Sequence, residues 1–81
     1  MSYNPQELLC WNVRGLNSLA RKKALREFVH SVRVAIICIL ETKLEMVDQF
    51  VIMQCLGPAY DGFYYLPASD TRGGIFVAWD S

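Results

Sequence analysis

The sequence lacks the features of several common classes of protein. Its three cysteines, Cys10, Cys38 and Cys55, are an odd set with no Cys-x-x-Cys pair, and we expect them to be buried, reduced thiols. No apolar run approaches the roughly 20 residues of a membrane helix. Residues 1–7 have neither the basic region nor the apolar core of a signal peptide. We therefore expect an intracellular protein, in the nucleus or the cytoplasm, that is not secreted and has no membrane partner.

The chain also lacks an excess of charge of either sign. Eight Lys and Arg residues balance eight Asp and Glu residues. A self-sufficient nucleic-acid binder carries a strongly positive field, so any contact of this chain with nucleic acid has to be local. One basic cluster comprises Arg21, Lys22, Lys23 and Arg26. It suits a DNA backbone, although a solvated helix surface is the interpretation that we favour.

Apolar side chains, in contrast, are abundant, at 53% of the 81 residues. A chain of this length has room for one small domain, which buries only about 60 to 65% of its unfolded surface. The apolar content exceeds what one thin core can hide. This surplus suggests that part of a larger domain is absent and that the stability of the chain is marginal.

The first half of the chain has the pattern of a strand, a helix and a strand. Nearly continuous apolar runs at residues 7–13 and 34–40 predict strands that are covered on both faces. Between them, apolar residues recur at helical spacing and predict a helix over residues 19–31. Either Asn17 or Ser18 would cap this helix.

The second half predicts a helix and two strands. Thr42 and Glu45 have the spacing of a capping box, and the helix would end before Gly57. Its apolar face would comprise Met46, Val47, Phe50, Val51 and Met53. Residues 60–66 and 73–79 predict two strands joined by a turn. The order strand, helix, strand, helix, strand, strand indicates an α/β fold.

Two polar residues, Asn12 and Glu41, close the first two predicted strands. A strand-helix-strand unit of this length normally has parallel strands, whose carboxyl ends share the sheet edge that binds ligands. Glu41 would suit magnesium, which takes one or two carboxylates, and Asn12 would hydrogen-bond a phosphate or a neighbouring group. In the alternative interpretation, Glu41 only favours the dipole of a helix capped by Thr42, and Asn12 begins a turn.

These residues lie in motifs that resemble a known superfamily. Residues 9–17 read Leu-Cys-Trp-Asn-Val-Arg-Gly-Leu-Asn, and residues 37–44 read Ile-Cys-Ile-Leu-Glu-Thr-Lys-Leu. They resemble the first two motifs of the endonuclease/exonuclease/phosphatase superfamily, which includes abasic-site endonucleases, DNase I and the endonuclease domains of non-LTR retrotransposons. Residues 66–68 and 71–80 are similar to the corresponding hairpin of plant retroelement versions.

The resemblance implies a DNase I-like two-sheet α/β sandwich. Residues 1–81 would be the incomplete amino-terminal portion of that domain, with two helices on one face of a sheet. The other face would be open because the opposite sheet is absent. It would expose either the set Leu9, Trp11 and Val13 or the set Leu8 and Cys10.

The resemblance also implies the roles of residues at the strand ends. Glu41 would bind the catalytic magnesium, Asn12 would help to hold the phosphate, and the metal would act as a Lewis acid. Arg14 stands where some relatives have an acidic residue, and it would touch a phosphate or remain solvated. Leu40 also departs from the glutamine that is frequent there. The family's later Asp-x-Asn and Asp-His pairs do not occur, and His30 is expected at a helix end.

Three functions fit this sequence. The first is part of a magnesium-dependent phosphodiesterase or DNA endonuclease of retroelement type, which is inactive alone. The chain would then descend from a hydrolase, while its catalytic site would be incomplete. The second is a non-catalytic interaction module that self-associates through an exposed apolar sheet, with the strand at residues 73–79 at an edge. The third is a decayed retroelement remnant without function.

Overall fold

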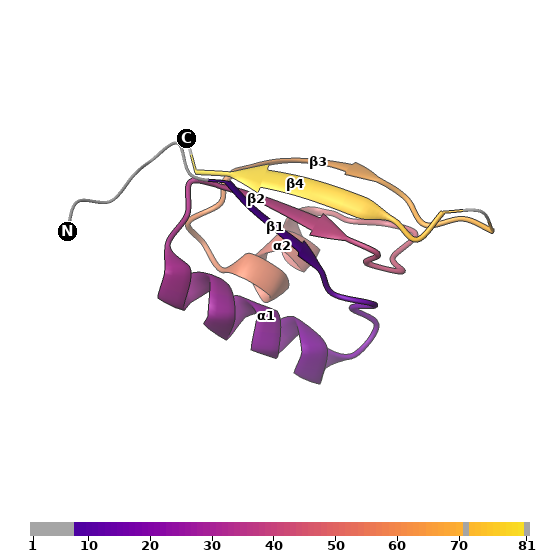
Figure 1. Cartoon of the computed structure of the whole chain (residues 1–81), viewed down its shortest axis with the longest axis horizontal. Helices are drawn as coiled ribbons and strands as arrows, with labels where there is room; N and C mark the ends of the chain where they lie inside the picture. The colour runs from indigo at the N-terminus through magenta and orange to yellow at the C-terminus, as the bar shows by residue number, and fades with distance from the viewer. Residues whose placement is uncertain (1–7, 71, 81) are drawn as a thin grey trace.

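The computed structural model describes residues 8–70 and 72–80, and within them a four-stranded sheet lies against two helices. The strands are β1 (Leu8–Asn12), β2 (Ile36–Leu40), β3 (Gly62–Leu66) and β4 (Ile75–Trp79). Their spatial order is β1-β2-β4-β3. Strands β1 and β2 are parallel, whereas β4 runs antiparallel to both of its neighbours. Figure 1 shows the sheet as one layer with both helices beneath it.

Helix α1 (Leu19–Val32) forms as the apolar spacing predicts. The Ser18 hydroxyl caps it by accepting the backbone N–H of Arg21 at 3.1 Å. It ends at Arg33, whose left-handed backbone directs its N–H to the carbonyl of Val29. The expected helix is therefore confirmed, with Ser18 as its cap.

Helix α2 (Gln49–Leu56) begins later than the sequence predicts. The Asp48 side chain caps it by accepting the N–H of Val51 at 2.9 Å. The expected capping box of Thr42 and Glu45 is wrong, because residues 41–48 form an irregular loop. The predicted apolar face is also largely wrong: Met46, Phe50 and Met53 are exposed, whereas the buried side chains of α2 are Ile52, Cys55 and Leu56.

The hydrophobic core fills the space between the helices and one face of the sheet. Leu25 and Val29 of α1 meet the buried residues of α2 there. The sheet contributes alternate residues, Ile37, Ile39, Phe76 and Ala78, all of which are fully buried. Intervening residues, such as Ile36, Leu40 and Tyr64, point to the other face and are partly or largely exposed.

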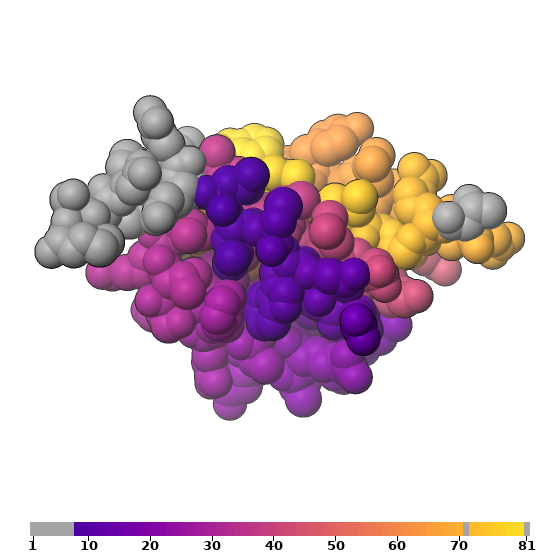
Figure 2. All heavy atoms as spheres, in the orientation of Figure 1, coloured from indigo at the N-terminus to yellow at the C-terminus, as the bar shows by residue number. Residues whose placement is uncertain are grey.

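The expectation that the first two strands are covered on both faces is wrong, because both helices lie on the same face of the sheet. Strand β1 also forms a sheet edge, so most of its side chains are exposed. In the space-filling view, its indigo atoms reach the surface above α1 (Figure 2). Of the two sets that the sequence left open, Leu8 and Cys10 share the open face with Ile36 and Cys38. Burial of Cys10 was thus a wrong expectation.

The expectation that the last strand lies at an edge is wrong as well, because β4 pairs with both β2 and β3. The parallel pairing of β1 and β2, the closing hairpin and the partial α/β sandwich are confirmed. Within residues 8–70 and 72–80, neither helix has the length and hydropathy required to span a membrane.

Candidate functional site

Asn12 and Glu41 meet at the carboxyl ends of β1 and β2. Asn12 pairs in register with Leu40, and Glu41 follows directly. The Asn12 amide Nδ2 donates to Glu41 Oε2 at 2.8 Å, while Asn12 Oδ1 accepts the backbone N–H of Arg14 at 3.1 Å. The expectation that these two polar residues share one rim is confirmed. Asn12 also begins a turn, as the alternative interpretation predicts, and its role toward a phosphate stays a prediction.

The loop that carries Glu41 is fixed by backbone hydrogen bonds on two sides. The carbonyl of Glu41 accepts the N–H of Gly15 at 2.7 Å, and the carbonyl of Thr42 accepts the N–H of Leu16 at 2.8 Å. On the other side, the N–H of Thr42 donates to the carbonyl of Gly74 at 3.1 Å. These bonds hold the carboxylate between the β1 loop and the segment that precedes β4.

Thr42 is the anchor of this loop. It is 1% exposed, and its Oγ1 accepts the N–H of Leu44 at 3.2 Å. Its neighbours Glu41 and Lys43 have left-handed backbones, with φ of 56° and 62°. Such conformations are uncommon for residues other than glycine and cluster at functional sites. They also prevent a helix from starting here, which is why the predicted capping box fails.

The structure rejects the alternative interpretation of Glu41. That interpretation required a helix capped by Thr42, whose dipole the Glu41 carboxylate would favour. Helix α2 begins only at Gln49 with Asp48 as its cap, and Glu41 is instead hydrogen-bonded to Asn12. Glu41 is therefore held at the sheet edge without a helix-capping role.

Glycines close to Glu41 make room for this arrangement. A Cβ on Gly73 would lie 3.2 Å from Glu41 Cγ and 3.3 Å from its Cα. A Cβ on Gly74, where φ is 88°, would lie 2.6 Å from Thr42 Oγ1. Sequence reasoning treated these residues only as the start of a strand. The Gly-Gly pair before an apolar run is the signal that could have indicated a close backbone approach.

Arg14 lies beside Asn12 in a left-handed conformation, with φ of 56°. Its carbonyl accepts Nη1 of Arg21 at 3.4 Å, and its side chain is exposed. The loop is thereby connected to the first turn of α1, where Lys22 and Lys23 follow. The structure thus brings Arg14 to the same edge as Asn12, and a phosphate-contacting role stays a prediction.

A hollow of about 490 Å³ opens next to Glu41. Its lining comes from the Glu41 loop and from the turn before β4: Glu41, Lys43, Glu45, Ala68, Ser69, Asp70, Arg72 and Gly73. Asp70, which the sequence indicated as a turn residue, does lie in that turn. The hollow is lined by side chains of both charge signs.

Glu41, which lines this hollow, is a residue whose carboxylate could hold a metal ion. Among residues 8–70 and 72–80, no group of three or more His, Cys, Asp or Glu side chains is gathered for one. Zinc, which normally requires at least three protein ligands, does not fit this donor set. Magnesium does, because it accepts one or two carboxylates and completes its shell with water and phosphate oxygens.

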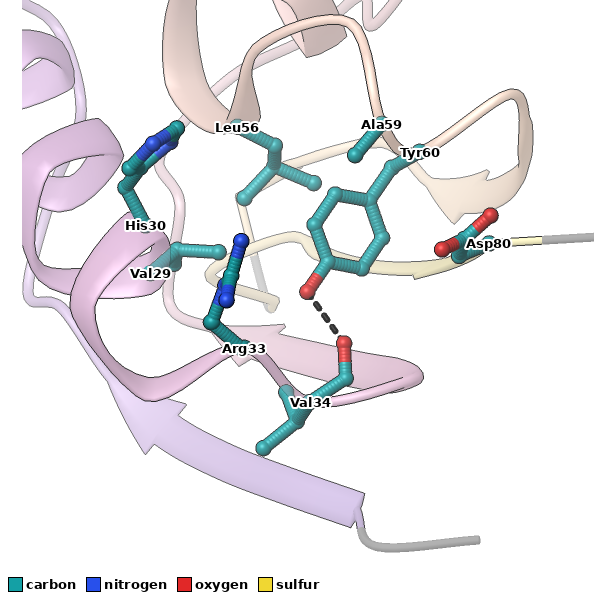
Figure 3. Close-up of a pocket in the computed structure, with 8 residues that line it drawn as sticks. All are labelled: Val29, His30, Arg33, Val34, Leu56, Ala59, Tyr60 and Asp80. Carbon is teal, nitrogen blue, oxygen red and sulfur yellow. Dashed lines mark hydrogen bonds between the residues drawn. The ribbon is translucent and has the colours of Figure 1, made fainter. Parts of the chain in front are cut away.

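His30 lies far from this edge. It is exposed in the last turn of α1 and lines a cavity of about 400 Å³ with Arg33, Tyr60 and Asp80 (Figure 3). Asp80 is bound through its N–H to the carbonyl of Ala35, at the opposite end of β2 from Glu41. The expectation that His30 is a helix-end residue is confirmed.

The sequence and the fold of this chain are similar to those of known proteins. The model of the Endonuclease/Exonuclease/phosphatase family matches residues 9–81. The crystal structure of AP endonuclease LMAP from Leishmania major is 33% identical to this chain and has a TM-score of 0.55. That match covers 90% of this chain but only 23% of the other chain. No curated protein sequence matches.

The family match includes β1, β2 and the loop that holds Glu41 against Asn12. The structural match places the sheet and its two helices in a DNase I-like α/β arrangement. This chain belongs to the endonuclease/exonuclease/phosphatase family.

Proposed function

We propose that this chain is the amino-terminal part of a magnesium-dependent phosphodiesterase that cleaves DNA inside the cell. The observation that carries this proposal is the hydrogen bond between Asn12 and Glu41 at the carboxyl edge of two parallel strands. Family membership supports the reaction class, and the similarity of residues 66–68 and 71–80 to plant retroelement hairpins supports a retroelement type.

Glu41 is the metal ligand in this proposal. Asn12 holds Oε2 of the carboxylate, and Oε1 would bind the cation. The amide hydrogen bond fixes the carboxylate orientation, as outer-shell partners do at many metal sites. When bound, magnesium would supply Lewis-acid polarisation of the phosphate.

DNA is the substrate that the charge distribution supports. The net charge of zero conceals an asymmetry, because six of the eight Lys and Arg residues lie between Arg14 and Arg33, with Glu27 as the one acidic residue among them. Arg14 and Arg21 bring positive charge from this segment toward Asn12. Contacts with phosphates require only positive charge at the surface, so this segment can bind a DNA backbone locally.

The 81-residue chain would not cleave DNA by itself. A water molecule needs a base to activate it, and His30 lies at the opposite end of the sheet. Within the described residues, no group of three or more His, Cys, Asp or Glu side chains is placed to hold a metal ion. The remaining groups would come from chain beyond these residues, since this match covers 23% of the related structure.

Manganese titration followed by NMR tests the site directly. Mn²⁺ can replace Mg²⁺ at oxygen sites, and its unpaired electrons broaden nearby signals. We expect broadening centred on the side-chain amide of Asn12 and the backbone amide of Thr42, with loss of the effect in Glu41→Gln. Glu45→Gln is the matched control, because Glu45 lines the same hollow. Broadening that is centred on Glu45 or Asp70 would refute the site. Broadening of the same size in Glu41→Gln as in wild type would also refute it.

A plasmid-nicking assay tests the proposed inactivity. The isolated chain should show the same background with magnesium as the Glu41→Gln variant. Magnesium-dependent nicking that is lost in this variant would show that 81 residues suffice.

The open sheet face supports a second candidate function, a non-catalytic module that self-associates. Leu8 and Tyr64 are 58% and 64% exposed on this face, and Trp79 and Leu66 are also exposed there. Contiguous apolar surface of this kind marks interaction sites. Light scattering should then show a defined dimer that Tyr64→Lys disrupts. A monomer at all accessible concentrations would exclude this function.

A further inference from the structure

Cys10 and Cys38 lie side by side on neighbouring strands. They are partners in the parallel register of β1 and β2, whose adjacent positions Figure 1 shows. Ile37 and Ile39, which flank Cys38 along β2, are buried against the helices, so the Cys38 side chain points to the open face. Cys10 is the register partner of Cys38 and therefore points to the same face. The two residues are distant in the sequence, and only the fold brings them together.

The spacing of the two residues suits a covalent bond. Neighbouring strands lie about 4.8 Å apart. Disulfides join Cα atoms that are roughly 4.4 to 6.8 Å apart, provided that the side chains project in compatible directions. The register pairs Cys10 directly with Cys38, so both cysteines lie on one face of the sheet. Neither thiol is yet bonded to another cysteine.

We propose that Cys10 and Cys38 form a redox-active dithiol site, which low-molecular-weight disulfides oxidise to an intramolecular disulfide. This inference concerns the 81-residue chain, in which this sheet face is open, and it does not require that the chain cleaves DNA. Disulfides of intracellular proteins are usually transient, and exposed ones are the more easily reduced. The site is therefore reversible.

The exposure of the thiols sets the order of the reaction. Cys10 is exposed, whereas Cys38 is half-buried, and desolvation together with the adjacent Cys10 raises the pKa of the Cys38 thiol. The thiolate of Cys10 attacks one sulfur of the oxidant, forms a mixed disulfide and releases one thiolate. Cys38 then loses its proton and attacks Cys10 Sγ, which releases the second thiolate. The protein loses two electrons and two protons, and the oxidant becomes two thiols.

Cys55 is excluded from this site. It is fully buried among the residues of α2, and burial raises the pKa of its thiol to about 11. Thiolates are the reactive species in exchange, so Cys55 is inert in the folded protein. Because Cys55 would react only in an unfolded chain, its modification reports whether the chain has unfolded during the experiment.

The cross-link would join the edge strand β1 to β2 just before Asn12 and Glu41. It would close a loop that contains all of α1. Closing such a loop stabilises the native state by restricting the unfolded chain. Oxidation should therefore raise the Tm of the chain and slow hydrogen exchange in β1.

Oxidised glutathione tests the proposal on the full 81-residue chain. After trapping with N-ethylmaleimide, intact mass should show loss of two hydrogens, about 2 Da, as the two-electron couple requires. Peptide mapping should find Cys10 joined to Cys38. Cys55→Ser should behave in the same way, whereas Cys38→Ser should retain a stable glutathione adduct on Cys10. Dithiothreitol should reverse the mass change.

Two outcomes would overturn the proposal. One is a wild-type chain that keeps glutathione on Cys10 or keeps both thiols open to alkylation. The other is a mixture of all three possible pairings, including Cys55, because that is what an unfolded chain would give. Repeating the oxidation in urea supplies this mixture as a reference. The Tm of the oxidised wild type, compared with and without dithiothreitol, gives a second readout that does not depend on variants.

Discussion

Asn12 and Glu41 share a hydrogen bond of 2.8 Å between Nδ2 and Oε2, across two parallel strands. The same asparagine accepts the backbone N–H of Arg14, so one side chain connects the carboxylate to the turn after β1. This arrangement fixes the carboxylate before any ligand arrives. A site built in this way loses less entropy when a cation or phosphate binds.

Thr42→Val should loosen the loop that holds Glu41. Thr42 is buried, and its hydroxyl accepts the N–H of Leu44. Valine has the same shape but leaves that N–H without a partner, at a cost of about 1 to 3 kcal/mol. Hydrogen exchange at Leu44 should become faster in Thr42→Val and stay near the wild-type rate in Thr42→Ser. Equal rates in both variants would show that the hydroxyl is not the anchor.

Gly74→Ala should destabilise the chain more than Gly62→Ala. At Gly74, a Cβ would approach Thr42 Oγ1 and the backbone N of Ala68, with φ of 88°. We expect a loss of roughly 2 kcal/mol in the free energy of unfolding, as for a clash at a special backbone conformation. At Gly62, the new methyl would displace the indole of Trp79, which can rotate. Denaturant melts, with Trp fluorescence to follow the indole, would contradict this ranking if the losses were equal.

Phe28→Ala should weaken the attachment of the edge strand. The rings of Trp11 and Phe28 lie 4.6 Å apart between centroids at an interplanar angle of 56°. Such an aromatic pair adds about 0.5 to 1.5 kcal/mol beyond the area that it buries. Hydrogen exchange in β1 should therefore increase. The matched control is Phe50→Ala, since Phe50 is 67% exposed on α2, and it should leave β1 unchanged.

Cys55 should lower the free energy of unfolding of the chain as the pH becomes alkaline. Burial raises the pKa of its thiol from 9.0 to about 11, so the unfolded chain loses this proton first. The stability from the buried thiol is complete below pH 9 and is lost as the pH rises toward 11. The advantage of wild type over Cys55→Ala should fall by about 1 kcal/mol between pH 8 and pH 10. A pH-independent difference in the free energy of unfolding would contradict this pKa.

Local sequence patterns predicted the elements that local physics determines. Apolar runs and a serine cap defined β1, β2 and α1, and the preference of strand-helix-strand units for parallel pairing brought Asn12 to Glu41. The start of α2 was missed because Thr42 is buried by long-range hydrogen bonds to the segment before β4. The Gly-Gly pair indicates a close backbone approach, but no local pattern tells that Thr42 is its partner.

Local patterns also could not predict which strand side chains are exposed to solvent. Continuous apolar runs indicate strands covered on both faces, yet both helices lie on one face, and Cys10 is exposed at the edge. The position of β4 between β2 and β3 likewise depends on pairing between segments that are distant in the sequence. Periodicity identifies which residues share a face, but it does not tell what covers that face.

A thermal melt with and without magnesium tests the central claim, that Glu41 and Asn12 form a cation site in the folded chain. A ligand that binds only the native state raises the Tm. We predict a cooperative transition that magnesium raises in wild type and in Glu45→Gln, raises less in Asn12→Ala, and leaves unchanged in Glu41→Gln. A magnesium effect of equal size in Glu41→Gln, or none in wild type, would contradict the account.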